Sequence, residues 1–218
     1  MSHGDTLTWS CEPPEIDVVK LLGVHKYKDM SKVSPVILKS AHRAIAQSIE
    51  FSDPRGYFTT TPIESLDEEG LDLFDGTRLN CTAFRDKLGG YDTLLSFVIT
   101  LGPKLDEEVS KGFADGSDPL GPLFLDTAGW LMIEASTRSF STYLKSEHFG
   151  GRQDLSTRMA PGYDYPIKGQ SDRAPWDLLE QAKLFGTFKN QDIPIELLDS
   201  GAMIPRLSRS GIFGVSLQ

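Results

Sequence analysis

The spacing of hydrophobic residues along the chain changes repeatedly between helical and extended patterns. Apolar side chains that recur at intervals of three and four residues predict amphipathic helices. Short segments rich in aromatic and β-branched residues, bounded by turn residues, predict strands. The helices are expected at residues 16–22, 35–51, 84–88, 104–112, 120–145 and 176–185, and the strands at residues 57–61, 93–102, 194–198 and 212–215.

Two of these elements carry the strongest signals. Residues 93–102 form an almost uninterrupted apolar run between turn residues, which is typical of a strand buried at the centre of a sheet. Residues 120–145 predict the longest helix, and Asp126 and Glu134 lie on or near its apolar stripe. A buried carboxylate needs a partner or becomes neutral. The two side chains are therefore either part of a polar site or lie at the edge of the stripe in water.

The segments between these elements favour loops and turns. Residues 64–76 are acidic and end in the turn signal Asp75-Gly76, and residues 208–211, Ser-Arg-Ser-Gly, also predict a turn. Residues 1–12 predict a loose leader, and residues 13–218 are enough for a single domain with a sizeable core. Because helices and strands alternate irregularly, we expect the α+β class.

The densest group of candidate binding residues is the sequence RMAPGY at positions 158–163. Proline biases the preceding Ala160 away from the helical region, and Gly162 allows a positive φ. Backbone groups of such a loop are not used in a helix or ladder, so we expect them to be free for a polar ligand. Arg158 suits a carboxylate or phosphate, and Tyr163 offers an apolar face with a polar tip. The same residues also fit an ordinary surface turn.

Composition narrows the possible classes of partner. The formal net charge of −9 argues against a nucleic-acid backbone or an anionic lipid surface, and an acidic surface also serves solubility alone. Neither the two cysteines nor the four histidines have the spacing of a metal site, so no metal is expected. The N-terminus lacks the pattern of a secretory signal, and no apolar run approaches the ~18 residues of a membrane span. We expect a soluble, cytoplasmic protein without a membrane or nucleic-acid partner.

The C-terminal third resembles a known family. The RMAPGY loop is followed by a Trp-x-Leu-Leu segment from Trp176, by Met203-x-Pro205 and by Ser-x-Ser-Gly from Ser208. This order is similar to that in the S-adenosylmethionine-binding activation domain of cobalamin-dependent methionine synthase, which has RPAPGY, WELL, MWP and SVSG. The N-terminal half is similar to small stand-alone relatives of that domain, with a "LLGV" helix, an apolar strand that ends in Thr-x-Gly and a long Asp…Glu helix. The likeness implies a twisted, mainly antiparallel sheet with flanking helices.

The resemblance also implies residue roles. Arg158 would pair with the methionyl carboxylate of S-adenosylmethionine, and Ala160 and Gly162 would supply close backbone contacts. Glu134 would face the positive charge of the ligand. Tyr163 would bind S-adenosylmethionine at the boundary between the ligand and the corrin, where an aromatic face suits a sulfonium. Together with Met203 and Pro205 it would also face the corrin of a cobalamin held by a partner protein. No residue is implied as an acid, base or nucleophile, because the bound methyl donor is positioned rather than activated.

The implied function is that of a stand-alone activation subunit. It would support the reductive methylation of the cobalamin of a separate methionine synthase, with a flavodoxin- or ferredoxin-type electron donor. Two alternatives remain. The protein would activate another corrinoid methyltransferase, or it would be a non-catalytic module with a degraded site that binds S-adenosylmethionine or corrinoid. The sequence ends at Gln218, before the tyrosine-bearing hairpin and terminal helix of the family domain. An acidic residue near the N-terminus of that domain also has no clear counterpart here, so part of the ligand cage is expected to be missing.

Overall fold

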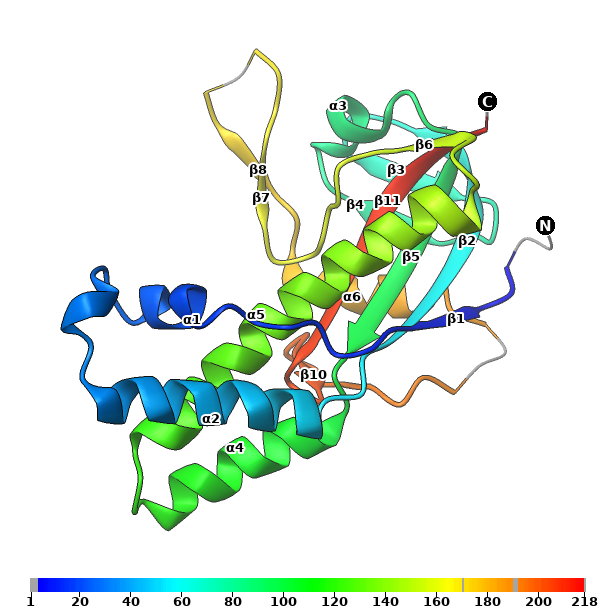
Figure 1. Ribbon diagram of the computed structural model, residues 1–218. Coiled ribbons are helices and arrows are strands. Elements are labelled where there is room, and N and C mark those ends of the chain that lie inside the picture. Colours follow the sequence, from blue (N-terminus) through cyan, green and yellow to red (C-terminus); the bar gives the residue numbers. More distant parts are fainter. Residues whose placement is uncertain (1–3, 170, 190–191, 218) are drawn as a thin grey trace.

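A computed structural model describes residues 4–169, 171–189 and 192–217 of the protein. Its main feature is an antiparallel sheet in the order β4-β3-β2-β5-β11-β6, with β1 added to β2 (Figure 1). This confirms the α+β class and the mainly antiparallel sheet. The strands of this sheet are β1 (Leu7–Ser10), β2 (Arg55–Leu66), β3 (Gly70–Leu73), β4 (Arg78–Asn80), β5 (Thr93–Thr100), β6 (Gln153–Leu155) and β11 (Ser208–Leu217).

Strand β5 is the centre of the sheet, as its apolar sequence predicts. It pairs with β2 on one side and with β11 on the other, and every one of its residues is buried. Leu95, Phe97 and Ile99 belong to the core on one face of the sheet, whereas Leu94 and Val98 belong to clusters on the other. Because both faces are covered, both sets of alternating positions are apolar.

Four helices form a layer on one side of the sheet, in which α5 lies across the strands and α1, α2 and α4 pack against α5 (Figure 1). The second begins at Pro35, where the Ser34 hydroxyl accepts a hydrogen bond from the Ile37 N–H, a common way to cap a helix start. The last is the longest, as predicted, and places the Phe140 ring among aromatic side chains of the sheet. These helices are α1 (Val18–Val24), α2 (Pro35–Phe51), α4 (Pro103–Asp115) and α5 (Leu120–Tyr143).

Short elements cover the other face of the sheet around the buried ring of Trp176, which packs edge-on against Phe84. A hairpin that follows the RMAPGY loop projects from the body at the upper left of Figure 1. The short elements of this layer are α3 (Phe84–Leu88), β7 (Asp164–Pro166), β8 (Arg173–Pro175), α6 (Gln181–Phe185), β9 (Glu196–Leu197) and β10 (Met203–Ile204).

The N-terminal leader and the acidic segment differ from their predictions. Residues 7–10 are not loose but form β1, and the Trp9 side chain is buried against Phe140, with ring centroids 5.2 Å apart. Residues 64–76 are not a loop, because β2 continues to Leu66 and β3 returns beside it. The acidic side chains of this region are tolerated because Arg78 binds two of them, Asp67 and Asp72.

Two segments near the C-terminus also depart from the predictions. The Ser-Arg-Ser-Gly stretch is not a turn, because its residues pair with β5 from Ser208 to Gly211. Glycine is required in that strand, since a Cβ at position 211 would lie 2.6 Å from the Met159 carbonyl oxygen. The helix predicted at residues 176–185 is a 3-10 turn, Leu178–Glu180, followed by α6. The strand expected at residues 194–198 is only the two residues of β9.

Candidate functional site

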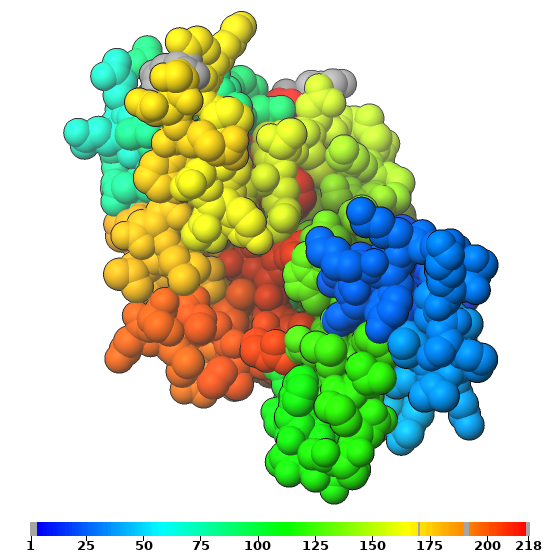
Figure 2. Space-filling view, turned by 90° about the vertical axis from the view of Figure 1, so that its left-hand side faces the viewer, coloured from blue at the N-terminus to red at the C-terminus, as the bar shows by residue number. Residues whose placement is uncertain are grey.

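A cavity of about 350 Å³ lies beside the start of β11, and we call it the β11 cavity. Figure 2 shows it as a hollow in which β11, in red, is surrounded by the yellow loop above, the orange segments below and α5 with α1 to the right. Segments far apart in the sequence therefore meet at one place. The cavity is lined by Trp130, Ile133, Ala160, Pro161, Tyr163, Leu178, Gln181, Gly201, Ala202, Met203, Arg206, Leu207, Ser208, Arg209 and Ser210.

The RMAPGY loop forms one wall and is held by its own backbone. Met159 and Ile212 exchange N–H···O hydrogen bonds of 3.0 and 2.7 Å, which fasten the loop to β11. The Gly162 N–H donates to the Trp176 carbonyl at 2.7 Å. Gly162 has φ of +84°, so the prediction of a positive φ at this glycine is confirmed. The loop is a fixed part of the site.

The expectation that the backbone of this loop is free needs correction. Ala160 is buried, and its N–H donates to the Tyr165 hydroxyl at 2.6 Å. The same hydroxyl donates to the Ala160 carbonyl at 2.9 Å. A buried backbone group without a partner is costly, and here a side chain from β7 satisfies both groups. A ligand that bonds to the Ala160 N–H must therefore displace Tyr165.

Replacement of Tyr165 by phenylalanine tests this brace. We expect Tyr165→Phe to lower the free energy of unfolding by about 1–3 kcal/mol, because it leaves a buried Ala160 N–H without a partner. Urea denaturation measures the loss. Tyr163→Phe is the matched control, since within the described residues the Tyr163 hydroxyl has no hydrogen bond and its ring is exposed. Equal stability of the Tyr165→Phe protein and the wild type would contradict a bracing role.

Arg158 lies half-buried, and its Nη1 atom is buried with no hydrogen-bond partner in the part of the chain that the structure describes. Burial and then the charge of Arg209 lower the pKa of Arg158, while the charge of Glu134 raises it. A guanidinium nevertheless stays protonated at neutral pH. A guanidinium nitrogen that is buried without a partner is a stronger indication of an anion site than a fully exposed arginine is.

Glu134 is close to this arginine but already has a partner. The guanidinium of Arg209, in β11, donates from Nη1 to the Glu134 carboxylate, and Arg138 lies 3.7 Å from the same carboxylate. Burial raises the pKa of Glu134, but the hydrogen bond from Arg209 and the surrounding arginine charges lower it more. Its pKa is therefore below its ordinary value, and the side chain is ionised at neutral pH.

Asp126, two turns before Glu134 in α5, is also paired with an arginine. Arg206 contacts both Asp126 and Asp106 of α4, with the nearest atoms 2.5 and 3.6 Å apart. Asp126 and Glu134 are both partly exposed, and each is bound to an arginine of the 206–209 segment rather than free in water. They hold that segment against the long helix.

The floor of the cavity is braced by a buried glutamine. Gln181 accepts a hydrogen bond from the Ser210 hydroxyl and donates to the Gly201 carbonyl, both at 3.0 Å. Its polar atoms are thus used to join the 3-10 turn region, β11 and the Gly201 turn. We infer a structural role for Gln181.

Some of the residues predicted to contact the ligand or the corrin line the cavity, and others do not. Tyr163 is 53% exposed and lines the cavity, and Met203 lines it while half-buried. Pro205, expected to face the corrin with them, is buried and is not among the lining residues. The exposed residue at this step is Ile204. Gly162 is exposed on the loop but is not among the lining residues.

Sequence reasoning missed two important residues of this cavity. Trp130 is 51% exposed on α5, where a large aromatic at an exposed helix position is the signal that could have identified it. Arg209 is part of the Ser-x-Ser-Gly motif, which predicts a turn. The motif therefore gives no sign of the contact between Arg209 and Glu134. Only the pairing of β11 with β5 brings it opposite α5.

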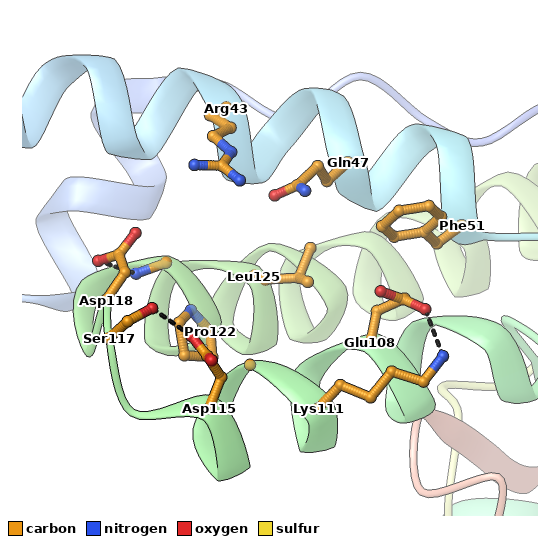
Figure 3. A pocket seen from close by; sticks show the side chains of 12 residues that line it. Arg43, Gln47, Phe51, Glu108, Lys111, Asp115, Ser117, Asp118, Pro122 and Leu125 are labelled. Carbon is orange, nitrogen blue, oxygen red and sulfur yellow. Dashed lines mark hydrogen bonds and ion pairs between the residues drawn. The ribbon is translucent and has the colours of Figure 1, made fainter.

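A second cavity, of about 370 Å³, lies between α2, α4 and the start of α5 (Figure 3). Arg43 and Gln47 point into it from α2, while its acidic groups are used locally. Glu108 pairs with Lys111 at 2.7 Å, and Asp118 accepts from the Leu120 and Gly121 N–H groups at 3.1 Å. None of the residues implicated by the RMAPGY motif lines it, so we do not place the predicted site there.

Residues 4–169, 171–189 and 192–217 contain no group of three or more histidine, cysteine, aspartate or glutamate side chains placed to hold a metal ion. This part of the chain also has no helix that is long and apolar enough to cross a membrane.

The sequence matches no family model and no curated protein. Among solved structures, the chain is similar to the crystal structure of the MetH reactivation domain bound to AdoHcy, with a TM-score of 0.71. The aligned part covers 98% of this chain and 79% of that chain at 14% sequence identity. At this identity the likeness concerns the backbone arrangement, so the chain has the fold of the MetH reactivation domain.

Proposed function

We propose that this protein binds S-adenosylmethionine in the β11 cavity and presents it to a cobalamin held by a separate protein. The observation that carries the proposal is the unpaired, buried Nη1 of Arg158 in the RMAPGY loop, within a reactivation-domain fold. The neighbour with this fold was crystallised with AdoHcy, which differs from S-adenosylmethionine by the transferred methyl group. The unsatisfied guanidinium fits the carboxylate of such a ligand.

The residues of the cavity supply binding and orientation. Arg158 does not line the cavity itself but lies in the RMAPGY loop that forms one wall, and from there it would hold the methionyl carboxylate. The exposed faces of Trp130 and Tyr163, which do line the cavity, suit an adenine ring or a sulfonium. S-adenosylmethionine, when bound, supplies an already activated methyl group, so no general acid or base is required of the protein. Its contribution is to fix the ligand at an open surface that a partner can approach.

Exposed apolar side chains around the cavity support the proposal that a partner protein binds there. Trp130 and Tyr163 are exposed beside it, and Leu178, Leu179 and Ile204 are exposed at or next to its lining segments. Exposed apolar side chains gathered at one site are typical of a surface that another molecule covers. The partner proposed first is a cobalamin-dependent methionine synthase, and another corrinoid methyltransferase is the alternative. The electron donor for the reductive step would be of the flavodoxin or ferredoxin type.

A second candidate function is that of a non-catalytic module with a degraded site. Two observations favour it. The Tyr165 hydroxyl is hydrogen-bonded to the backbone N–H and carbonyl of Ala160, and Arg209 donates a hydrogen bond to the Glu134 carboxylate. The Ala160 backbone and Glu134 are groups that the family resemblance assigns to the ligand. If these contacts persist, the cavity offers fewer polar groups than a complete binding site.

Calorimetric titration with S-adenosylmethionine tests the proposal. Saturable binding by the wild-type protein would support it, and reductive methylation of a purified cobalamin protein in the presence of this chain would then identify the partner. If binding occurs only when a cobalamin protein is present, the partner completes the site. The absence of binding in both experiments would contradict the proposal and favour the degraded module.

Tyr163 provides a separate test of the exposed apolar side chains. We expect Tyr163→Phe to keep both ligand binding and reactivation, because the aromatic face is retained. Tyr163→Ala is expected to slow the methylation of the partner's cobalamin by roughly tenfold, because the aromatic face at the boundary between ligand and partner is lost. Phe113→Ala, at an equally exposed ring on α4, is the control. An unchanged methylation rate for Tyr163→Ala would remove Tyr163 from the contact surface.

A further inference from the structure

Arg209 is placed to influence what the β11 cavity binds. The odd-numbered neighbours of Arg209 in β11, Phe213 and Val215, pack in the core below the helices, so Arg209 on the same side of the strand reaches α5. Its side chain is only 13% exposed and lines the cavity. There it donates to the Glu134 carboxylate.

The charges near this contact are predominantly positive. Of the described residues that line the cavity, the charged ones are Arg206 and Arg209. Arg158 lies close enough to Arg209 for their charges to disfavour each other, and Arg138 lies on the far side of Glu134. One carboxylate, Glu134, thus faces three guanidinium groups, those of Arg138, Arg158 and Arg209.

We propose that Arg209 sets the charge preference of the cavity by lowering its affinity for a sulfonium relative to a neutral thioether. This inference rests on the proposed function, because it concerns ligands of the S-adenosyl class in the same cavity. S-adenosylmethionine and S-adenosylhomocysteine share the carboxylate, the amino group and the nucleoside. They differ in the methyl group and in the positive charge on sulfur.

The physical reason is that Arg209 lines the cavity and neutralises Glu134, the carboxylate that lies directly behind it. Without the arginine, Glu134 would present a net negative charge, which attracts a sulfonium and is indifferent to a thioether. With the arginine in place, a sulfonium meets a paired carboxylate and two further cations. Any effect of Arg209 on the ligand carboxylate is common to both ligands and cancels in the ratio of their affinities.

The test compares both ligands, by calorimetric titration, on four proteins: the wild type, Arg209→Met, Glu134→Gln and the double variant. We expect Arg209→Met to shift the affinity ratio towards S-adenosylmethionine by about tenfold, an effect typical of a partly buried charge. Glu134→Gln should shift it in the opposite direction, and the double variant should return close to the wild type because both charges are gone. Arg209→Lys, which keeps the charge, should leave the ratio unchanged.

The outcomes separate this inference from the proposed function. If the wild type binds both ligands and the ratio is the same in all variants, the role of Arg209 is refuted while the proposed function stands. If the wild type binds neither ligand, alone or with a cobalamin protein, the proposed function fails and this inference fails with it. Circular dichroism melts check that each variant is folded, and Arg209→Gln takes the place of Arg209→Met if that variant does not fold.

Discussion

Arg158→Ala is expected to weaken the binding of S-adenosylmethionine by about 2 kcal/mol or more, which is roughly 30-fold in the dissociation constant. The guanidinium has a buried Nη1 with no partner among the described residues, and a ligand carboxylate would supply that partner. The lost interaction is a charge-assisted hydrogen bond at a partly buried site. Such a bond is stronger than a charge-assisted hydrogen bond at an exposed surface. Calorimetric titration measures the change directly.

The protein offers good controls for this variant. Arg158→Lys keeps the positive charge but lacks the planar fork, so we expect an intermediate affinity. Arg138→Ala removes a nearby cation that also faces Glu134 but is largely exposed, and little change is expected. Because the buried Nη1 of Arg158 has no hydrogen-bond partner among the described residues, its removal should not unfold the chain. An affinity for Arg158→Ala equal to that of the wild type would show that the carboxylate binds elsewhere.

Phe140→Ala is expected to lower the free energy of unfolding by about 3–5 kcal/mol. The ring is fully buried on α5 and lies at the centre of an aromatic cluster. Its centroid is 5.2 Å from that of Trp9 and 5.4 Å from those of Phe58 and Phe97. These three rings come from β1, β2 and β5, so the substitution leaves a cavity where the longest helix meets the sheet.

Urea denaturation of three variants tests the cluster. Phe140→Leu, which nearly conserves volume, should cost less than about 1.5 kcal/mol. Phe113→Ala removes a ring of α4 that is 53% exposed, and should change stability by no more than about 0.5 kcal/mol. A loss below about 1 kcal/mol for Phe140→Ala would contradict the central position of this ring. An unchanged dependence of the unfolding free energy on urea concentration would confirm that the fold itself is retained.

Long elements with a regular pattern could be predicted from the sequence. The apolar run of β5, the stripe of α5 and the Ser34-Pro35 start of α2 each contain their own signal, because burial and capping act within one segment. Short elements were predicted less well. Strand β1 exists because Trp9 packs on Phe140, and the 208–211 stretch is a strand because β5 pairs with it. No local preference of serine or glycine indicates either outcome.

The candidate site shows the same division. The RMAPGY loop, the positive φ allowed at Gly162 and the candidates Arg158 and Glu134 could be predicted from residue types and from one turn. Which of their polar groups have partners depends on the packing of distant segments. Tyr165 comes from β7 to satisfy Ala160, and Arg209 comes from β11 to bind Glu134, whereas Arg158 Nη1 has no partner among the described residues. Buried polar groups take whichever partner the fold brings near, and that choice is not contained in any local segment.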